Sequence, residues 1–223
     1  MNFPNITKLL VCFLALSFSF SATAQNEKYT KLYHQRASLF EELPIKSSDI
    51  VFLGNSITHF CEWSELLNNR KIKNRGISGD IVQGVYDRLD PILAGKPKKI
   101  FLMIGINDVS HDVLADSIVR AIRRVADKIA SDSPKTKLYI QSTLPVNDRF
   151  GLFLGATKKG SVVIDINRGL KDMCTEKGLT YIDIYSALKS ADSEKLNPEY
   201  TNDGLHLLGK AYLIWGELLK KYL

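Results

Sequence analysis

The feature that most constrains the fold is an alternation of short apolar segments with amphipathic ones along most of the chain. Strands are expected at residues 50–53, 72–75, 99–104, 137–141 and 180–184, and helices at 26–41, 60–69, 81–93, 112–131, 161–177 and about 207–222. The segment "KIFLMIG" is apolar nearly throughout, as in a strand buried on both faces. This alternation predicts a parallel sheet with helices on both faces, hence one three-layer α/β domain with a five-stranded sheet.

The first 24 residues differ from the rest of the chain. Lys8 is followed by the apolar run "LLVCFLALSFSF" and then by Ala22-Thr23-Ala24. A positive residue, a short apolar core and an A-x-A site are typical of a secretory signal peptide. We therefore expect cleavage before Gln25, export to the periplasm or out of the cell, and a single mature domain of residues 25–223. An uncleaved membrane anchor is the alternative, although the run is short for a bilayer span.

Composition argues against several classes of protein. Hydrophobic residues make up 45% of the chain and charged residues 24%, which is ordinary for a globular protein. The formal net charge is +6, but the basic residues are dispersed and not interleaved with aromatic ones, so no nucleic-acid partner is expected. Cys61 and Cys174 have no Cys or His at metal-ligand spacing, so no metal site is expected. A disulfide between them is the less favoured alternative to two free thiols.

Polar clusters follow the expected strands at their carboxyl ends. They are Gly54-Asn55-Ser56, residues 77–80, residues 105–108 and residues 144–147, and "NDGLHLLG" at 202–209 leads into the last helix. Right-handed crossovers place such loops along one edge of a parallel sheet, where open α/β sheets bind their ligands. The sequence therefore predicts one site at this edge.

The residue types in these clusters fit acyl transfer, which needs a nucleophile, a base and a group that orients the base. Ser56 is the candidate nucleophile. Among the four histidines, His206 stands out because Asp203 precedes it by three residues and Gly204 lets the backbone bend between them. On this spacing alone, a simple helix N-cap at Asp203 with a surface His206 is the blander and more frequent interpretation.

Three groups are candidate donors for an oxyanion hole. They are the backbone N–H groups of Ser56 and Gly79 and the side-chain amide of Asn107. Alternatively, "GISGD" is a plain turn with Asp80 as an N-cap, and Asn107-Asp108 is a turn whose acid caps the next helix. The glycine patterns of nucleotide-binding loops do not occur here. Each signal is weak alone, but together they supply every part of one mechanism.

Four blocks, in this order, resemble the SGNH, or GDSL-type, hydrolase family: "FLGNSIT", "NRGISGD", "GIND" and "DGLHL". The resemblance extends from about residue 48 to the end. The second block is similar to the branch of platelet-activating-factor acetylhydrolase-like and carbohydrate acetylesterase members. The resemblance implies a flavodoxin-like fold and ester hydrolysis without a metal or organic cofactor. It also implies a triad of Ser56, His206 and Asp203, with oxyanion donors from Ser56, Gly79 and Asn107.

One position departs from the family pattern, which has Gly-Asp-Ser where this chain has Gly54-Asn55-Ser56. Asparagine keeps the size of aspartate and one acceptor oxygen but loses the charge. If this position only supports the turn through hydrogen bonds, Asn55 can serve. If its charge tunes the site, the rate is expected to fall.

The expected function is that of an exported serine esterase that hydrolyses carboxylic esters, above all acetyl esters on carbohydrates, through an acyl-enzyme. A short-chain lipid esterase or lysophospholipase is the enzymatic alternative, and a non-catalytic carbohydrate-binding envelope protein is the alternative of another class. The expected partner is a small ester or an acetylated glycan, with no stable membrane insertion after signal cleavage. The oligomeric state is not predicted.

The loop "VNDRFGLFLGATKKG" at 146–160 is expected to form a wall of the substrate pocket. Within it, Asn147, Asp148 and Arg149 are candidates for contacts with sugar hydroxyls. Phe150, with Leu152 and Phe153, is a candidate for an apolar contact with an acyl group or lipid. A mobile surface loop is the alternative.

Overall fold

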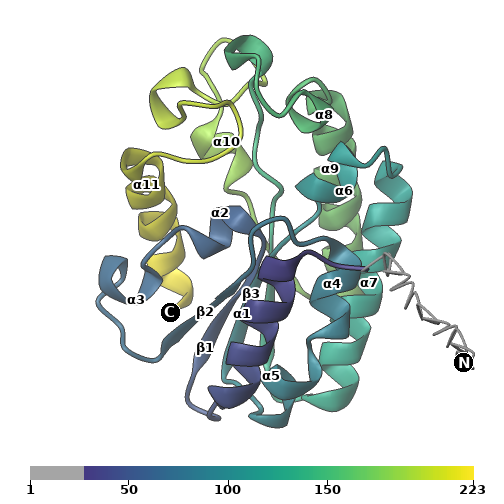
Figure 1. Cartoon of the computed structure of the whole chain (residues 1–223), viewed down its shortest axis with the longest axis vertical. Coiled ribbons are helices and arrows are strands. Elements are labelled where there is room, and N and C mark those ends of the chain that lie inside the picture. Colours follow the sequence, from purple (N-terminus) through teal and green to yellow (C-terminus); the bar gives the residue numbers. More distant parts are fainter. Residues whose placement is uncertain (1–27) are drawn as a thin grey trace, which may run out of the picture.

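A computed structural model describes residues 28–223, so the predicted signal peptide lies outside the described residues. Five parallel strands form one sheet in the order β2-β1-β3-β4-β5 (Figure 1). They are β1 (Ile50–Gly54), β2 (Ile72–Gly76), β3 (Lys99–Met103), β4 (Lys137–Gln141) and β5 (Thr180–Ile182). This order is that of flavodoxin-like folds, and it confirms the predicted three-layer α/β architecture.

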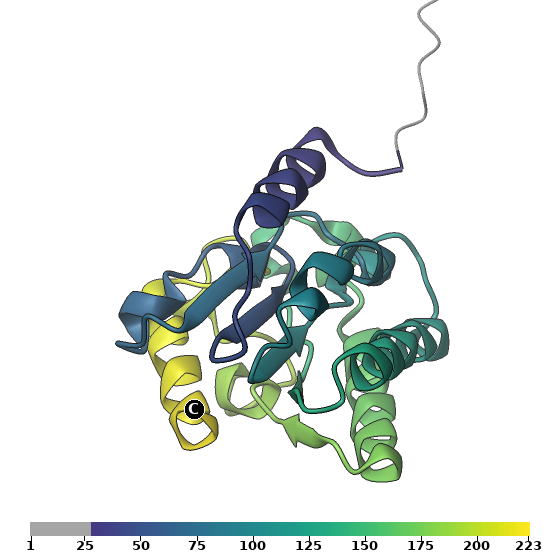
Figure 2. The same ribbon diagram turned by 90° about the horizontal axis from the view of Figure 1, so that it is seen from below.

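Helices cover both faces of the sheet, and several of the short ones lie at its carboxyl edge. The longer ones are α1 (Lys31–Glu42), α7 (Ala115–Asp132), α9 (Gly160–Lys177) and α11 (Gly209–Leu219). The shorter ones are α2 (Ser56–His59), α3 (Trp63–Leu66), α4 (Val82–Asp87), α5 (Asp90–Ala94), α6 (Ile106–Ser110), α8 (Leu154–Thr157) and α10 (Tyr185–Leu188). Single 3₁₀ turns are η1 (Asp148–Phe150), η2 (Pro198–Tyr200) and η3 (Lys220–Tyr222). Helices α4, α7 and α9 pack side by side, and α3 and α11 lie across the sheet from them (Figure 2).

The expected helix at 81–93 is divided into α4 and α5 in the structure. Pro91 lies in the first turn of α5 and has no N–H to donate to a carbonyl one turn earlier, so a continuous helix would lose a hydrogen bond there. The other expected elements agree with the structure to within a few residues at most ends. The short helices at the carboxyl edge were not expected, because each is only about one turn long and carries no periodic pattern.

Aromatic rings tie α3 and α11 to the sheet beneath the carboxyl edge. Phe52 of β1 stacks on Trp63 of α3 with centroids 4.5 Å apart, and on Phe101 of β3 at 5.0 Å. Trp215 of α11 meets Trp63 edge-on at 4.7 Å. The Trp215 Nε1 donates a hydrogen bond of 2.8 Å to the side-chain oxygen of Gln141, which is buried at the end of β4. These contacts fix the two elements that flank the predicted site.

Cys61 and Cys174 are both buried and both free, in agreement with the favoured expectation. Within residues 28–223 we find no helix whose length and apolar character would let it cross a bilayer.

Replacing Trp215 with Phe removes the N–H that pairs with the buried oxygen of Gln141. We expect the free energy of unfolding to fall by about 1 to 3 kcal/mol, because a buried acceptor without a partner keeps its desolvation cost. Urea denaturation followed by circular dichroism measures the change. Adding Gln141→Leu removes the unpaired acceptor and should recover part of the loss. A double variant no more stable than Trp215→Phe alone would contradict this role of the hydrogen bond.

Candidate active site

The turn after β1 presents Ser56 at the carboxyl edge of the sheet. The strand ends at Gly54, and Ser56 is the first residue of α2. Between them, the Asn55 side-chain oxygen accepts a hydrogen bond of 3.1 Å from the backbone N–H of Ile57. The Asn55 side chain is buried and supports the turn through its oxygen, which is a role that a neutral amide can fill.

The short helix α2 is held from two sides. The Tyr212 hydroxyl of α11 donates a hydrogen bond of 2.8 Å to the carbonyl of Ile57. The Asn74 side-chain amide of β2 donates to the carbonyl of His59 at 3.1 Å. Because α2 is anchored at Ile57 and at His59, Ser56 has a fixed position. Only 4% of the Ser56 surface is exposed.

The loop before α11 brings a base to Ser56. The His206 Nε2 lies 3.0 Å from Ser56 Oγ, although 150 residues separate the two. The His206 Nδ1 lies 2.7 Å from Asp203 Oδ2. Because α11 begins only at Gly209, both residues lie in the loop rather than in the helix. The arrangement has the order of contacts in which a serine attacks, a histidine takes its proton and a carboxylate orients the histidine.

Asp203 is held as a carboxylate by its surroundings. Its Oδ1 accepts hydrogen bonds of 2.8 Å from the backbone N–H groups of both Leu205 and His206. Partial burial acts to raise the pKa of Asp203, but the hydrogen bonds from the His206 ring and from the two N–H groups outweigh it and hold the pKa below its ordinary value. The ionised carboxylate favours a proton on Nδ1, which leaves Nε2 free to accept one from Ser56.

The loop after β4 supports the His206 loop through its backbone. The Asn147 N–H donates a hydrogen bond of 2.8 Å to the carbonyl of Gly204. Gly204 has a φ of +85°, and a Cβ there would lie 1.9 Å from the Asn147 carbonyl oxygen, so only glycine fits. The Asn147 side chain is buried, donates to the Leu196 carbonyl at 2.7 Å and accepts from the Arg149 N–H at 3.1 Å. Because its amide is used within the protein, we assign Asn147 no contact with a substrate. In the same loop, Arg149 is exposed, and its guanidinium lies 5.6 Å from the centroid of the Phe150 ring.

Two aromatic rings lie close to the His206 imidazole. Phe153, in the loop after β4, comes within 5.1 Å of the imidazole, centroid to centroid, at an interplanar angle of 82°. Phe60, at the end of α2, lies 5.3 Å from the imidazole at 48°. Sequence reasoning did not single out Phe60, because an isolated exposed aromatic residue is common at protein surfaces.

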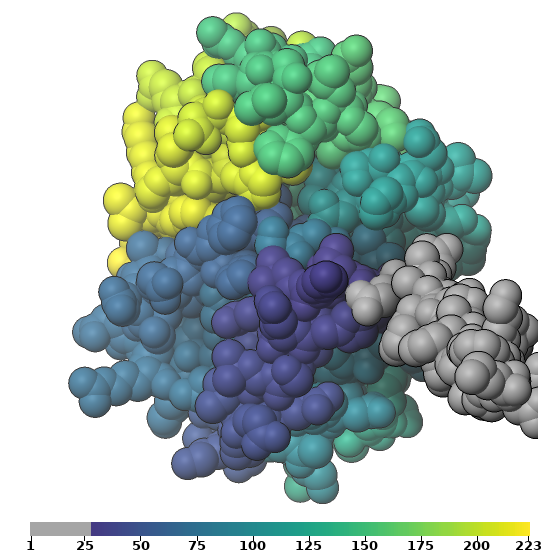
Figure 3. Space-filling model, viewed as in Figure 1, coloured from purple at the N-terminus to yellow at the C-terminus, as the bar shows by residue number. Residues whose placement is uncertain are grey.

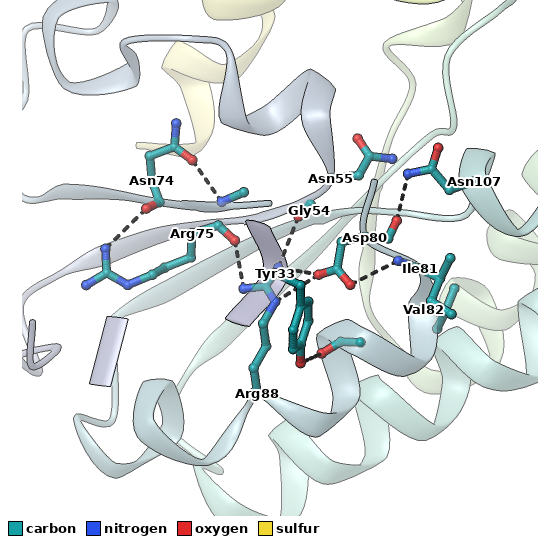
Figure 4. Close-up of polar contacts among 12 residues, drawn as sticks. Tyr33, Gly54, Asn55, Asn74, Arg75, Asp80, Ile81, Val82, Arg88 and Asn107 are labelled. Carbon is teal, nitrogen blue, oxygen red and sulfur yellow. Dashed lines mark hydrogen bonds and ion pairs between the residues drawn. The ribbon is translucent and has the colours of Figure 1, made fainter. Parts of the chain in front are cut away.

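The three candidate oxyanion donors lie at this edge of the sheet. The Ser56 N–H is the first of α2 and has no acceptor within the helix. Gly79 adopts a left-handed φ of +80°, and a Cβ there would meet no atom within 4 Å. The Asn107 side-chain amide donates one N–H to the carbonyl of Asp80 at 2.8 Å (Figure 4). That hydrogen bond orients the amide and leaves its second N–H available.

A buried ion pair joins the two strand ends to the Gly79 loop (Figure 4). The Arg88 guanidinium contacts Asp80 Oδ2 at 2.8 and 2.9 Å, and the two side chains are 4% and 0% exposed. Arg88 also donates to the carbonyl of Gly54 at 3.0 Å and to that of Arg75 at 2.8 Å. The Arg88 side chain therefore connects Gly54, two residues before Ser56, with Asp80, directly after Gly79.

Sequence reasoning missed Arg88 and treated Asp80 only as a helix cap. A signal was present: Arg88 follows Val85 by three residues and precedes Ile92 by four, so it lies on the buried stripe of the expected helix at 81–93. A charged residue on such a stripe needs a buried partner. Burial raises the pKa of Asp80 to about 6, and the contacts with Arg88 oppose this rise.

Asp108 caps a helix other than the one expected. Both of its carboxylate oxygens accept from the backbone N–H of Val82, at 3.1 and 3.3 Å, so Asp108 of α6 caps the first turn of α4. This contact joins α6, which carries Asn107, to the start of α4, which follows the loop that carries Gly79. Burial raises the pKa of Asp108 to about 6.

The remaining histidines are not part of this constellation. His34 and His111 are exposed, and His59 is partly buried at the end of α2, where burial lowers its pKa. In the described part of the chain, no group of three or more His, Cys, Asp or Glu side chains could hold a metal ion.

Two cavities adjoin the candidate site. A cavity of about 10 Å³ lies among buried apolar side chains that include Ile57, Val146 and Leu205, neighbours of Ser56 and His206. Another, of about 290 Å³, reaches Gly79 and is lined partly by Tyr29 and Tyr33. In the space-filling view, the C-terminal, central and early segments meet around a hollow in the upper half of this face (Figure 3).

Residues 52–214 match the GDSL-like Lipase/Acylhydrolase family. Among curated proteins, the chain is 29% identical over 106 residues to the platelet-activating factor acetylhydrolase IB subunit alpha1 of Rattus norvegicus, and 28% identical to that of Homo sapiens. Each match covers 45% of this chain and 45% of the relative. The aligned region thus spans about half the length of the curated relatives.

Solved structures share the fold over most of the chain. A protein of Streptococcus pneumonia described as a platelet activating factor superposes with a TM-score of 0.78 and 28% identity, covering 86% of this chain and 92% of the other. An acylhydrolase from Bacteroides fragilis has a TM-score of 0.74 and 22% identity, covering 85% and 94%. An acetyl-xylooligosaccharide esterase from Geobacillus Stearmophilus has a TM-score of 0.64 and 18% identity, covering 79% and 94%.

Replacing Arg88 with Met leaves Asp80 as a buried charge without its partner. We expect the free energy of unfolding to fall by about 3 to 5 kcal/mol, the usual cost of breaking a buried pair. Arg123→Met is the matched control, because its ion pair with Glu176 is solvent-exposed and should be worth less than about 1 kcal/mol. Urea denaturation of both variants measures the difference. Equal losses in the two variants would contradict the structural role given to Arg88.

Proposed function

Because the chain belongs to the GDSL-like Lipase/Acylhydrolase family, we propose that it is an ester hydrolase with Ser56, His206 and Asp203 as its catalytic triad. The observation that carries this proposal is the 3.0 Å contact between His206 Nε2 and Ser56 Oγ, together with the 2.7 Å contact between His206 Nδ1 and Asp203. Family membership argues against the non-catalytic binding protein considered from the sequence.

In the proposed reaction, His206 Nε2 accepts the Ser56 proton as Oγ attacks the ester carbonyl. The Asp203 carboxylate stabilises the imidazolium that forms and keeps the ring oriented. His206 then gives the proton to the leaving alcohol oxygen, which leaves an acyl group on Ser56. A water molecule, deprotonated in turn by His206, hydrolyses this acyl-enzyme and restores the free serine.

The proposed oxyanion hole comprises the N–H groups of Ser56 and Gly79 and the amide of Asn107. Its support is the fixed Asn107 amide, which is oriented by the Asp80 carbonyl at 2.8 Å, and the open space beside Gly79. Each such donor typically contributes about 3 to 4 kcal/mol to transition-state stabilisation. Because Arg88 links Asp80 to the carbonyl of Gly54, the donors and the nucleophile are held in one frame.

We place the acyl group in the small cavity lined by Ile57, Val146 and Leu205. Its volume of about 10 Å³ accommodates about one water-sized group. The methyl group of an acetyl ester has about this size, whereas a longer acyl chain would have to displace buried side chains. The cavity therefore supports acetyl esters as the substrates.

For the alcohol part of the ester, we favour a carbohydrate. The cavity beside Gly79, lined partly by Tyr29 and Tyr33, has room for further sugar units of a glycan beyond the one that carries the ester, and aromatic rings of this kind commonly pack against sugars. One structural neighbour is an acetyl-xylooligosaccharide esterase. A short-chain lipid ester is the second candidate, favoured by the exposed Leu152 and Leu154 near the site and by the name of the curated relatives. Export through residues 1–24 is part of the same proposal and fits an extracellular glycan.

Ser56→Ala should lower hydrolysis of p-nitrophenyl acetate by about 10⁴-fold or more, because the nucleophile is lost. A fluorophosphonate probe should label the wild-type protein at Ser56 and leave the variant unlabelled. Ser38→Ala, on the exposed face of α1, is the control and should behave like the wild type. Turnover retained in a folded Ser56→Ala variant would disprove the assignment.

The acyl cavity predicts a sharp dependence on chain length. With p-nitrophenyl esters, kcat/KM should fall by about tenfold or more from acetate to butyrate, because butyrate adds two methylene groups to the acyl chain in a small apolar pocket. Val146→Ala enlarges the cavity and should shift the preference toward butyrate.

Val125→Ala is the matched control, because it removes the same atoms from the buried face of α7, away from this cavity. It should leave the preference unchanged. Similar rates for all chain lengths in the wild type would show that the cavity does not hold the acyl group.

A further inference from the structure

Two exposed phenylalanine rings lie against the imidazole of His206. Phe60 is 54% exposed and Phe153 is 51% exposed, yet each ring centroid lies little more than 5 Å from that of the imidazole. These distances are typical of contacting aromatic pairs. Each ring therefore uses part of its surface to enclose His206 and leaves the remainder open to an incoming molecule.

The backbone conformation of Phe153 is fixed by the hydrogen bonds of its loop and is not one that phenylalanine itself favours. Its φ of +48° lies in the left-handed region, which is unfavourable for a large side chain. The backbone is locked there because the Phe153 carbonyl accepts from the N–H groups of Ala156 and Thr157 at 2.8 and 2.9 Å. The Thr157 hydroxyl also donates to the carbonyl of Leu152 at 2.8 Å. Strained residues held in this way are concentrated at functional sites.

The chemistry of the proposed reaction indicates which part of the ester these rings meet. His206 must return its proton to the leaving oxygen, so that oxygen lies within hydrogen-bond distance of Nε2. The carbon atoms next to it then lie close to the two rings that contact the imidazole. The acyl group and the oxyanion are placed elsewhere, in the small cavity and beside Gly79. The rings are thus positioned to contact the alcohol half of the ester.

We propose that Phe60 and Phe153 form a subsite for the alcohol half of the substrate, and that this subsite selects compact ring alcohols with an apolar C–H face, as a sugar ring has. The inference rests on the proposed function and deepens it. The two rings are inclined to the imidazole at 48° and 82°, so the leaving oxygen is bordered by two separate aromatic surfaces of different tilt. A compact ring next to that oxygen presents a broad C–H face to such surfaces, whereas an extended chain requires a continuous apolar groove.

The test keeps the acetyl group constant and varies the alcohol. The substrates are ethyl, n-hexyl and cyclohexyl acetate and a mono-O-acetylated methyl xyloside. The variants are Phe60→Ala and Phe153→Asn, the latter because asparagine tolerates the left-handed backbone. Leu213→Ala is the matched control, since Leu213 is an apolar residue on α11 that is even more exposed than the two rings. Circular dichroism and urea denaturation establish that each variant is folded.

We expect each ring variant to lose about tenfold more kcat/KM on cyclohexyl acetate and on the xyloside than on ethyl acetate, whose small alcohol covers less of the two rings. The control should match the wild type on all four esters. Equal losses on ethyl acetate would overturn the subsite, because the rings would then act on His206 itself. A larger loss on n-hexyl than on cyclohexyl acetate would overturn the selection of rings in favour of a chain alcohol.

The wild-type protein separates failure of this inference from failure of the proposed function. Turnover of ethyl acetate together with fluorophosphonate labelling supports the esterase even if the rings prove neutral. A wild-type protein with no turnover of any ester and no labelling overturns both.

Discussion

The positions of the proposed nucleophile Ser56 and of the Gly79 loop depend on one buried guanidinium. Arg88 donates to the carbonyls of Gly54 and Arg75, near the carboxyl ends of two neighbouring strands, and pairs with Asp80 in the adjoining loop. A buried pair of this kind adds little net stability, since two charges must be desolvated. It does make one arrangement of the three segments far more favourable than its neighbours, because any shift leaves a charge or a carbonyl unpaired. The turn that carries Ser56 and the loop that carries Gly79 are therefore positioned together.

Much of the fold could be predicted because its signals are local. Apolar runs at 50–53 and 99–104 identify buried strands, and the parallel topology follows from the alternation with helices. The rule that crossovers are right-handed then brings Ser56 and His206 to one edge across 150 residues of sequence. The resemblance to the family then completed the proposed triad with Asp203.

What could not be predicted depends on side chains that bond to backbone groups or that meet only in space. The backbone carbonyls that pair with Arg88 cannot be identified from the residue types, since every residue has a carbonyl group. Asn147 was expected to face a sugar, but its amide is directed to Leu196 inside the fold. Phe60 and Phe153 come from different loops, so their meeting at His206 appears only once the loops are placed.

Asn55, which precedes the proposed nucleophile Ser56, makes one hydrogen bond of the site independent of pH. An amide oxygen accepts a hydrogen bond at every pH, whereas an aspartate in the same place would become protonated at low pH. The contact between Asn55 and the N–H of Ile57 therefore persists under acid. Acid inactivation of this chain must then begin at its titratable groups, and not at the turn that carries Ser56.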